Sequence, residues 1–401
     1  MRRIRQVDAF ASPSRKLTPL DSTFVEGTDN WALAGSRVVV VGGGVIGTMH
    51  AYAALARGAM VVHLERDHVA QGATVRNFGL VWVSGRAPGR ELELALRARQ
   101  LWQVIGENVP LVGFRANGSL TLATRPDEME VLECASSRGD ATQRGFALVD
   151  VDEARRRNPA LRGTFLGGLY CDLDAAVESR SALGALREAM HATKRYEYLA
   201  RHEIVGVGDF EVVDHRGVCH RGDQVFLCLG ASLSGFAAEL FATEPLRTVR
   251  LQMAETEQCA DVLTTSVASG DSLRYYPAFQ EFSHRLVPQD EHAAHYAIQL
   301  LCQQRLDGGL TIGDTHEVDE PGDFATRDDP LSLIAASAKY LIGERMPRIE
   351  RRWSGTYHQL TDPGANDVYF RKRVAHGVTA ITGAGGRGMT LAPAIAEESF
   401  Q

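Results

Sequence analysis

Three glycines at the end of an apolar segment have the spacing of a phosphate-binding turn. Gly42, Gly44 and Gly47 form the pattern GxGxxG directly after segment 36–41, whose β-branched residues suit a buried parallel strand. The first glycine permits a tight turn, the second lets the backbone approach a pyrophosphate, and the third lets a helix pack on the strand. That helix would begin near Val45 and Ile46 and direct its free amides at the phosphates.

A second strand and an acidic residue complete this motif. Segment 60–64 is again apolar and ends in Glu65, which is followed by Arg66. A carboxylate at this distance from the glycines can accept hydrogen bonds from the ribose hydroxyls of an adenine dinucleotide. Strand, glycine turn, helix, strand and acid in this order predict a dinucleotide-binding site, of which Arg66 is a further candidate residue.

The motif fits both NAD and FAD, and the loop that follows favours FAD. An NAD enzyme normally continues straight into its next βαβ unit, whereas segment 68–82 is rich in small and polar residues. Such a loop can lie along the pyrophosphate and ribityl chain of FAD. The candidate cofactor-binding residues of this loop are Thr74, Arg76, Asn77, Phe78, Gly79 and Leu80.

Two later segments fit the same cofactor. Segment 223–229 is a predicted buried strand that closes on Leu229 and Gly230 near the adenosine, and Ile204 lies in a segment expected along the adenine edge. Segment 378–382 is a further predicted strand, and a second glycine turn and a helix follow it. The backbone amides of this turn would face the flavin ring and stabilise negative charge on it. Its candidate residues are Gly386, Arg387, Gly388, Met389 and Thr390.

Taken in order, these motifs resemble those of the superfamily of D-amino-acid oxidase, glycine oxidase and sarcosine oxidase. The resemblance covers residues 36–398 and also includes LTIGDTHE (310–317) and RRWSGTY (351–357). RNFGLVW (76–82), ALRARQLW (95–102), GSLTLA (118–123) and the GMT segment (388–390) are most similar to a branch associated with aminophosphonate breakdown. The resemblance implies non-covalent FAD and an oxidoreductase that acts on a CH–NH or CH–NH2 group.

The resemblance also implies the reaction. A hydride passes from the carbon beside nitrogen to flavin N5, the imine hydrolyses, and O2 or another acceptor reoxidises the flavin, O2 giving hydrogen peroxide. We expect a small zwitterionic amine as substrate, with an aminophosphonate or its N-alkyl derivative favoured. The alternatives are glycine, sarcosine or a D-amino acid, a 2-hydroxy acid, and a flavin-binding subunit without turnover.

The chain departs from this superfamily at the residue that anchors the substrate. The glycine-oxidase type usually carries WxGxRP, whose arginine clamps a carboxylate, but Tyr357 and His358 stand here in place of arginine and proline. Tyr357 and Arg387 are therefore our candidates for binding an anion, with Arg76 as another. Each also has a structural interpretation: Tyr357 as a core aromatic, Arg387 as the partner of Glu397, and Arg76 as a loop or phosphate anchor.

Two further candidates for the catalytic site lie elsewhere. Tyr276, which follows Tyr275, is expected near the roof of the substrate site. The resemblance places His316 near the flavin. Both residues are also compatible with a packing role. Residues 313–317 (GDTHE) lack the following glycines of aromatic hydroxylases, which argues against a monooxygenase. His292 and His295 lack an apparent third ligand, so no metal site is predicted.

Fold class and domain organisation follow from the order of the elements. We predict an α/β fold in which a Rossmann-like FAD-binding domain is built from residues 36–90, 150–245 and 350–398. Residues 91–149 and 246–349 would form a substrate domain of α+β type around an antiparallel sheet. The first 35 residues are interpreted as a leader or packed arm without catalytic residues.

Composition restricts the remaining possibilities. The 401 residues carry a net charge of −7, which argues against a nucleic-acid surface. No apolar run approaches the ~20 residues needed to cross a bilayer, so no membrane partner is expected. Six scattered cysteines without a CxxC pair favour reduced thiols and a cytoplasmic location. We expect a monomer or homo-oligomer.

Overall fold

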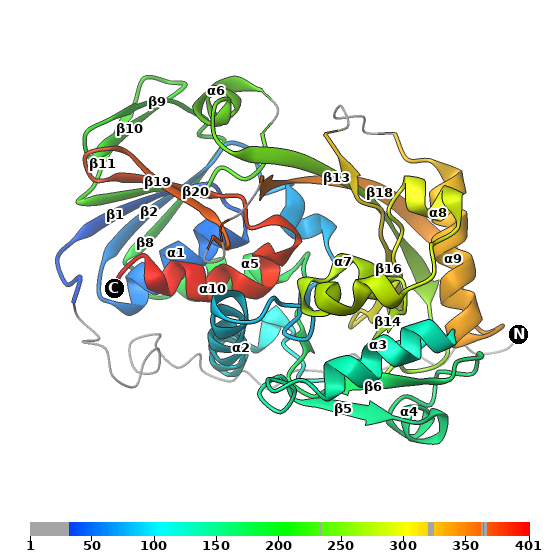
Figure 1. Cartoon of the computed structure of the whole chain (residues 1–401). Coiled ribbons are helices and arrows are strands. Elements are labelled where there is room, and N and C mark those ends of the chain that lie inside the picture. The colour runs from blue at the N-terminus through cyan, green and yellow to red at the C-terminus, as the bar shows by residue number, and fades with distance from the viewer. Residues whose placement is uncertain (1–31, 233, 320–324, 362–363, 365–366) are drawn as a thin grey trace, which may run out of the picture.

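The computed structural model describes residues 32–232, 234–319, 325–361, 364 and 367–401. Most of the N-terminal segment interpreted as a leader or arm therefore lies outside the described residues. Two sheets dominate the fold, each with helices against it (Figure 1). No helix among the described residues has both the length and the apolar character needed to cross a membrane. The predicted mixture of parallel and antiparallel α/β structure is confirmed.

The first sheet has six strands in the order β19-β20-β12-β1-β2-β8. All its pairs are parallel except β19 with β20. Its strands come from distant parts of the sequence: β1 (Arg37–Val41), β2 (Met60–Glu65), β8 (Tyr196–Ala200), β12 (Gln224–Leu227), β19 (Phe370–Ala375) and β20 (Val378–Thr382).

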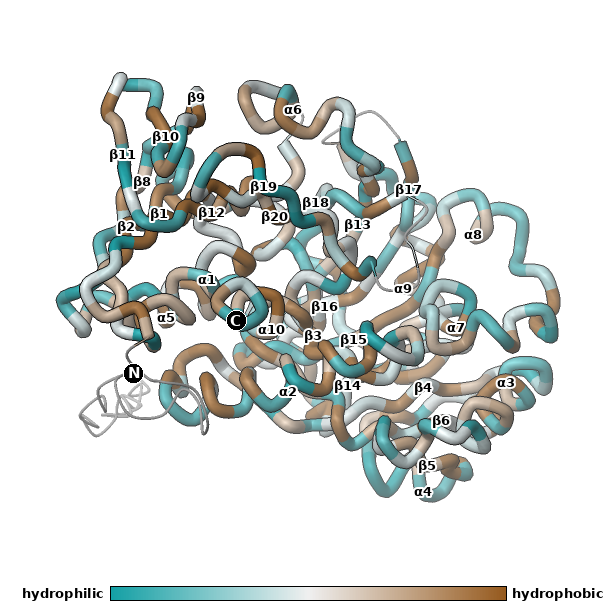
Figure 2. The backbone as a smooth tube through the Cα atoms, turned by 60° about the vertical axis from the view of Figure 1, so that its left-hand side comes forward, coloured by the Kyte–Doolittle hydropathy of each residue, from teal (hydrophilic) through white to brown (hydrophobic). Residues whose placement is uncertain are grey.

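Both faces of this sheet are covered. Val38 and Val40 of β1 pack in one apolar cluster with α1 (Val45–Ala56), α5 (Ala182–His191) and α10 (Gly388–Glu398). Val39 and Val41 point to the other face, towards a small sheet of β9 (Ile204–Gly208), β10 (Glu211–Asp214) and β11 (Cys219–Arg221), and towards α6 (Gly235–Phe241). Val38 to Val41 are buried on both faces of the sheet, which agrees with the apolar run in this part of β1 (Figure 2).

The helices α1 and α10 bring the two ends of the described chain together. They lie side by side against the first sheet, blue and red in Figure 1, and α2 (Arg90–Asn108) packs on α10. The Nε1–H of Trp102 in α2 donates a hydrogen bond to the carbonyl of Met389 at 2.9 Å. The two glycine turns, which begin α1 and α10, therefore belong to one packed unit.

The second sheet has nine strands in the order β17-β13-β16-β15-β14-β4-β6-β5, and β18 pairs with β13. These strands are mostly antiparallel, with one parallel pair, β14 with β4. Their bounds are β4 (Ser119–Ala123), β5 (Phe146–Val149), β6 (Gly167–Cys171), β13 (Leu246–Gln258), β14 (Ser266–Ser269), β15 (Leu301–Gln304), β16 (Gly309–Gly313), β17 (Glu317–Val318) and β18 (Ile349–Leu360).

Further elements surround the second sheet or connect the two. The helices are α3 (Pro126–Ser136), α4 (Val151–Arg157), α7 (Ser272–Tyr275), α8 (Glu291–His295) and α9 (Asp328–Ile342). In addition, β3 (Leu80–Val81) pairs with β7 (Ala175–Ala176) in a separate two-stranded sheet. Short 3-10 helices span Ala73–Arg76, Pro110–Val112, Pro277–Arg285 and Gly385–Arg387.

Two strands of the second sheet come from segments that are predicted from the sequence to belong to the FAD domain. They are β6 and all of β18 except Ile349. Strand β18 pairs with β13 along almost its whole length, from Ile349 to Leu360, and cross-strand pairing of this extent is invisible in a single strand's pattern. The discontinuous domain division otherwise stays a prediction.

Candidate active site

A cavity of about 300 Å³ runs from the first glycine turn to the second sheet. Its wall includes Gly42 and Val45 at the start of α1, Tyr357 of β18, and Met389 at the start of α10. A smaller cavity of about 60 Å³ shares Gly42 and Glu65 with it. One continuous space thus connects the predicted phosphate-binding turn with the predicted substrate site.

The first glycine turn is closed too tightly for side chains. A Cβ on Gly42 would lie 2.2 Å from the Cys228 carbonyl oxygen, and one on Gly47 would lie 1.9 Å from the Gly42 carbonyl oxygen. Gly42 also has a φ of +105°, which L-residues rarely adopt. The helix α1 follows a glycine without a side-chain cap, and its first amide, Val45 N–H, donates to the Thr74 hydroxyl at 2.9 Å.

Buried side chains of β2 hydrogen-bond to the backbone of this turn. The Glu65 carboxylate accepts hydrogen bonds from the amides of Gly43 at 2.7 Å and Asp67 at 2.9 Å. The His63 ring makes hydrogen bonds to the Gly42 carbonyl at 2.9 Å and to the Tyr196 hydroxyl at 2.8 Å. Burial lowers the pKa of His63 to about 4, so the ring is neutral and its Nε2–H donates to Gly42.

The loop after Glu65 is fixed by its own side chains. Asn77 donates to the Thr74 carbonyl at 2.7 Å and accepts from the Gly79 amide at 2.6 Å. The Arg76 guanidinium donates to the carbonyls of Gln71 and Ser354 at 2.8 and 2.7 Å. These bonds anchor the loop, and Arg76 also lines the cavity, so its contact with substrate or phosphate stays a prediction.

The second glycine turn is tied to the same loop. The Thr390 hydroxyl accepts from the Trp82 amide at 2.9 Å and donates to the Leu80 carbonyl at 3.3 Å. This hydroxyl thus holds the start of α10 against β3, and the wall of the cavity near the predicted flavin ring is continuous.

The structure brings most of the predicted site residues to one cavity. Those on its wall are Gly42, Gly44, Val45, Ile46, Glu65, Arg66, Thr74, Arg76, Asn77, Phe78, Leu80, Tyr276, His316, Leu229, Gly230, Tyr357, Gly386, Arg387, Gly388, Met389 and Thr390. Ile204 lines the smaller cavity instead. Gly47 and Gly79 line neither, and both are packed against backbone: a Cβ on Gly79 would lie 2.0 Å from the Val177 carbonyl oxygen.

Two tyrosines meet at the substrate end of the cavity. The hydroxyl of Tyr275 lies 3.2 Å from that of Tyr357, within hydrogen-bonding distance. Burial raises the pKa of both phenols, so both remain neutral donors. A Cβ placed on Gly386 would lie 3.1 Å from the Tyr275 hydroxyl, which shows how close the glycine turn comes. Tyr276 packs beside them, its ring 6.0 Å from that of Trp82.

Two arginines share one carboxylate in the same region. Arg387 Nη1 lies 3.1 Å from Glu91 Oε2, and Arg86 Nη1 lies 3.5 Å from Glu91 Oε1. Glu397, the partner considered for Arg387 from the sequence, is instead paired with Arg97. Both arginines line the cavity, and the group carries one net positive charge. Arg387 is a candidate predicted from the sequence, whereas Arg86, which precedes the helix α2, was not predicted.

An acidic residue of the GDTHE motif was also missed. Asp314 follows β16, lines the cavity, and accepts a hydrogen bond from the Gln299 side chain at 3.0 Å. His316, the predicted candidate, lies with its Nε2 3.8 Å from Asp314 Oδ2 and its ring centroid 3.9 Å from that of Tyr275. A carboxylate directly after a buried strand was the available signal for Asp314.

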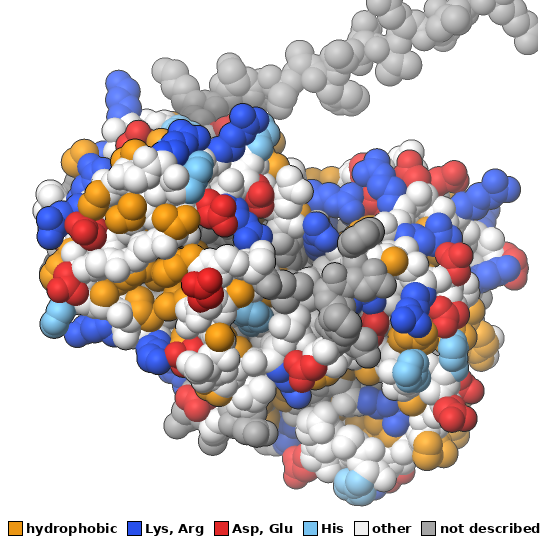
Figure 3. All heavy atoms as spheres, turned by 90° about the horizontal axis from the view of Figure 1, so that it is seen from above, with side chains coloured by type: hydrophobic (Ala, Val, Ile, Leu, Met, Phe, Trp, Pro, Cys, Tyr) orange, Lys and Arg blue, Asp and Glu red, His pale blue; other side chains and the backbone are white. Residues whose placement is uncertain are grey.

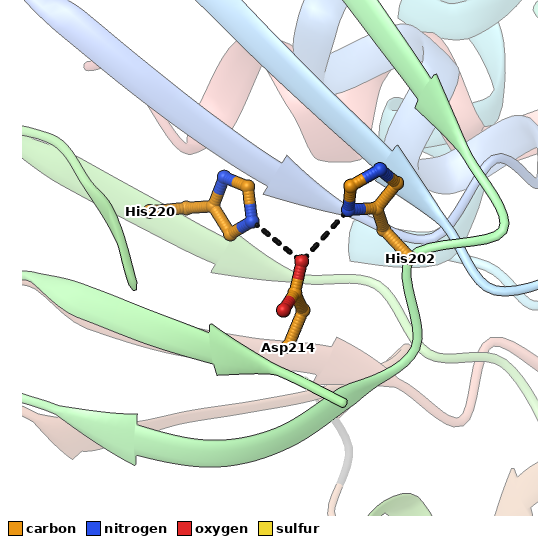
Figure 4. Close-up of side chains that lie close together, drawn as sticks. All are labelled: His202, Asp214 and His220. Atoms are coloured by element: carbon orange, nitrogen blue, oxygen red, sulfur yellow. Dashed lines mark hydrogen bonds and ion pairs between the residues drawn. The ribbon is translucent and has the colours of Figure 1, made fainter. Parts of the chain in front are cut away.

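A second group of ionisable residues lies in the small three-stranded sheet (Figure 4). Asp214 Oδ2 accepts hydrogen bonds from His202 Nδ1 at 2.7 Å and His220 Nε2 at 3.1 Å. Burial by itself would raise the pKa of Asp214. The two histidine bonds and two hydrogen bonds from backbone amides outweigh it, so the pKa lies below its usual range. The ligand atoms lie within 4.8 Å of one another, yet each is used in a hydrogen bond that joins β10 and β11 to the segment after β8. The prediction of no metal site stays a prediction.

Comparison with known proteins places the chain. The family model for FAD-dependent oxidoreductases of the DAO type matches residues 37–400. The chain belongs to this family. FAD is accordingly the cofactor of the family, and the predicted oxidoreductase class is confirmed. The predicted superfamily is confirmed too, whereas its aminophosphonate branch is not.

Individual relatives are distant. The chain is 22% identical over 333 residues to one of the opine oxidase subunits of Rhizobium meliloti, covering 79% of this chain and 81% of that protein. Among solved structures, glycine oxidase from Geobacillus kaustophilus has a TM-score of 0.71 at 19% identity, over 90% of this chain and 93% of that one. Iminodiacetate oxidase from a Chelativorans species has a TM-score of 0.69 at 19% identity, over 90% and 93%.

The residues present fit FAD. Gly42, Gly44, Val45 and Ile46 of the first glycine turn line the cavity, and so do Thr74 and Asn77 of the following loop and the start of α10. These segments would hold the adenosine phosphates, the ribityl chain and the flavin ring in that order. On the face seen in Figure 3, Lys and Arg side chains are interspersed with Asp and Glu, unlike the single-sign patch of a nucleic-acid surface.

Proposed function

We propose that this member of the family oxidises the C–N bond of a small zwitterionic amine, an aminophosphonate or its N-alkyl derivative being favoured. One observation carries this proposal: a cationic group and a carboxylate both line the substrate end of the cavity. Arg86 and Arg387 retain a net positive charge after pairing with Glu91, and Asp314 lies on the same cavity wall. A substrate with opposite charges complements such a site.

The chain's own residues bind and orient, while the cofactor supplies the redox chemistry. FAD, when bound, would supply the hydride acceptor and the route for electrons to O2, with hydrogen peroxide as product, or to another acceptor. The hydroxyls of Tyr275 and Tyr357 are neutral donors that can complement the arginines at an anion with several oxygens. Leu251, Met253 and Trp82 also line the cavity, and their apolar side chains would keep water from the reacting carbon.

A second candidate substrate class is a secondary amine with carboxylates, and two comparisons favour it. An opine oxidase subunit and iminodiacetate oxidase are among the similar proteins, and iminodiacetate is a secondary amine with two carboxylates. Glycine or sarcosine remains a further alternative, supported by the structural similarity to glycine oxidase. A 2-hydroxy acid fits less well because it offers no cation to the carboxylate of Asp314.

Anaerobic reduction of the bound flavin tests the proposal. The holoenzyme is mixed with N-methyl-2-aminoethylphosphonate, iminodiacetate, sarcosine, glycine or lactate, and the flavin absorbance is followed. We expect bleaching by the phosphonate and slower bleaching by the carboxylates. Bleaching by iminodiacetate alone would identify the substrate as a secondary amine with carboxylates and reject the phosphonate. Bleaching by lactate alone, or by none of the five, would overturn amine oxidation; the last result would agree with a non-catalytic flavin-binding protein.

A further inference from the structure

Asp314 is a buried carboxylate on the wall of the cavity with capacity for a further hydrogen bond. Its side chain lies on the cavity wall at the end of β16 and is only 6% exposed. Oδ1 accepts the hydrogen bond from Gln299, the carboxylate also accepts one from the backbone amide of Asp314 itself, and His316 Nε2 lies 3.8 Å from Oδ2, beyond hydrogen-bonding distance. A carboxylate can accept roughly four hydrogen bonds, so it has capacity for a further donor bound in the cavity.

Gln299 provides an unpartnered acceptor at the same place. This side chain is 2% exposed, lines the cavity, and uses its amide nitrogen on Asp314. Its Oε1 is buried and has no hydrogen-bond partner among the described residues. Two neighbouring acceptors, one of them charged, match a cationic group that carries two N–H bonds.

The charges around Tyr275 and Tyr357 favour a substrate whose cationic nitrogen lies towards Asp314. Burial raises the pKa of Tyr275 and Tyr357; beyond burial, Asp314 raises and Arg387 lowers the pKa of each phenol. Both charges therefore act on this one pair of hydroxyls. A small zwitterion that spans the tyrosines can place its anion towards Arg387 and its nitrogen towards Asp314.

We propose that Asp314 and Gln299 bind the ammonium group of the amine substrate, and that Asp314 accepts the proton this group loses before oxidation. The inference rests on the proposed function and names its amine-binding subsite. In the proton transfer, an N–H bond breaks, its electron pair stays on nitrogen as a lone pair, and an O–H bond forms at Asp314 Oδ2. The neutral amine that results can release a hydride from its adjacent carbon.

The surroundings of Asp314 suit this role. Burial raises the pKa of its carboxyl, against the opposing effects of His316 and Gln299, so the group is a stronger base than an exposed aspartate. The other titratable groups that interact with it are Tyr275, Tyr276 and Tyr357, all of which are buried phenols that burial keeps neutral.

Matched ligands with and without nitrogen test the binding step. The probes are iminodiacetate against diglycolate, and N-methyl-2-aminoethylphosphonate against 2-methoxyethylphosphonate; in each pair an ether oxygen replaces the amine. Affinities are measured from the perturbation of the flavin spectrum in anaerobic holoenzyme, before reduction. We expect the wild type to prefer the amine of at least one pair, and Asp314→Asn to lose about 10- to 100-fold in amine affinity while ether affinity stays within about twofold.

The variants also separate binding from proton transfer. Gln299→Leu should weaken amine binding and shift the ionisation that controls flavin reduction to higher pH, because it removes a hydrogen bond that lowers the pKa of Asp314. Asp314→Asn should abolish that ionisation, and Asp314→Glu should restore part of the rate. Asp174→Asn is the matched control, because Asp174 is also a buried carboxylate whose pKa burial raises, yet it does not line the cavity.

Three outcomes would overturn the inference: equal binding of amine and ether by the wild type, an unchanged preference in Asp314→Asn, or no binding of any of the four probes. Failure of the proposed function looks different, since there no amine reduces the wild-type flavin. Reduction of the flavin by amines together with an unaffected Asp314→Asn variant rejects this inference alone.

Discussion

Arg387 Nη1 lies 3.1 Å from Glu91 Oε2, and this ion pair connects the second glycine turn to the first turn of α2. Both side chains are largely buried, at 14% and 6% exposure. Arg86 approaches the other oxygen of the same carboxylate. The anion-binding candidate of the site is thus held in place by a residue nearly 300 positions away in the sequence, and its charge is only partly neutralised.

Arg387→Ala should weaken substrate binding more than FAD binding. Removing the guanidinium leaves Glu91 with Arg86 alone, so the net positive charge of the group is lost and KM should rise about 10- to 100-fold. KM and the dissociation constant of FAD are measured side by side, with exposed Arg373→Ala as the control. Loss of FAD with unchanged substrate affinity in reconstituted enzyme would refute an anion-binding role.

Tyr357→Phe tests the tyrosine pair. The variant keeps the ring and removes one hydroxyl of the 3.2 Å contact with Tyr275, so a donor to the substrate is lost without a cavity. We expect kcat/KM to fall about tenfold, which corresponds to roughly 1.4 kcal/mol, with FAD content unchanged. Tyr340→Phe, on an exposed part of α9, should have no effect. Equal activity of the two variants would make Tyr357 a packing residue.

The tightest contact of the first glycine turn predicts a loss of stability. In Gly47→Ala the new Cβ would lie 1.9 Å from the Gly42 carbonyl oxygen, so helix and strand must separate. The free energy of unfolding should fall by about 1–3 kcal/mol and the flavin content of the purified protein should drop. Gly139→Ala is the control, because a Cβ there meets nothing within 4 Å. Full flavin content and an unchanged melting temperature in Gly47→Ala would contradict the packing.

Acid should destabilise the protein through two buried histidines. Burial lowers the pKa of both His50 and His63 to about 4, against about 6.5 in the unfolded chain. Below 6.5 the unfolded state binds protons that the folded state does not, so the contribution of these two histidines to stability falls as the pH drops from 6.5 to 4 and levels off below.

The midpoint of urea unfolding, measured across this range, checks the direction. The two groups together correspond to an upper limit of roughly 6–7 kcal/mol, and local rearrangement reduces it. His63→Gln should flatten the profile because it removes one of them. A midpoint that rises towards pH 4, or the same slope in wild type and variant, would contradict the assignment.

The sequence predicted those parts of the site that local backbone geometry determines. The turn requires glycine at Gly42 for its positive φ and at Gly47 for close packing. The spacing of these two glycines is therefore recognisable in a single sequence. The strands around β1 are buried on both faces and therefore appear as apolar runs. The helix α10 was likewise recognisable from the glycines that precede it.

The polar contacts at the substrate end were less accessible to prediction. Arg387 pairs with Glu91 rather than Glu397 because α2 packs on α10 with a register that depends on both helices. Asp314 and Gln299 come from opposite ends of a hairpin-like path through β15 and β16, and only the pairing of these strands brings them together. Such contacts depend on tertiary pairing, which neither periodicity nor a motif in one segment records.

The position of α10 has a consequence for how the protein acquires its cofactor during biosynthesis. The cavity needs the turn that precedes this helix, and Trp102 and Thr390 anchor that turn to segments made far earlier. A nascent chain still short of Thr390 on the ribosome therefore presents the first glycine turn without the wall opposite it. Capture of the flavin becomes a late, maturation-like event, and a shortened translation product would expose apolar surface of α1 and α2 to chaperones and proteases.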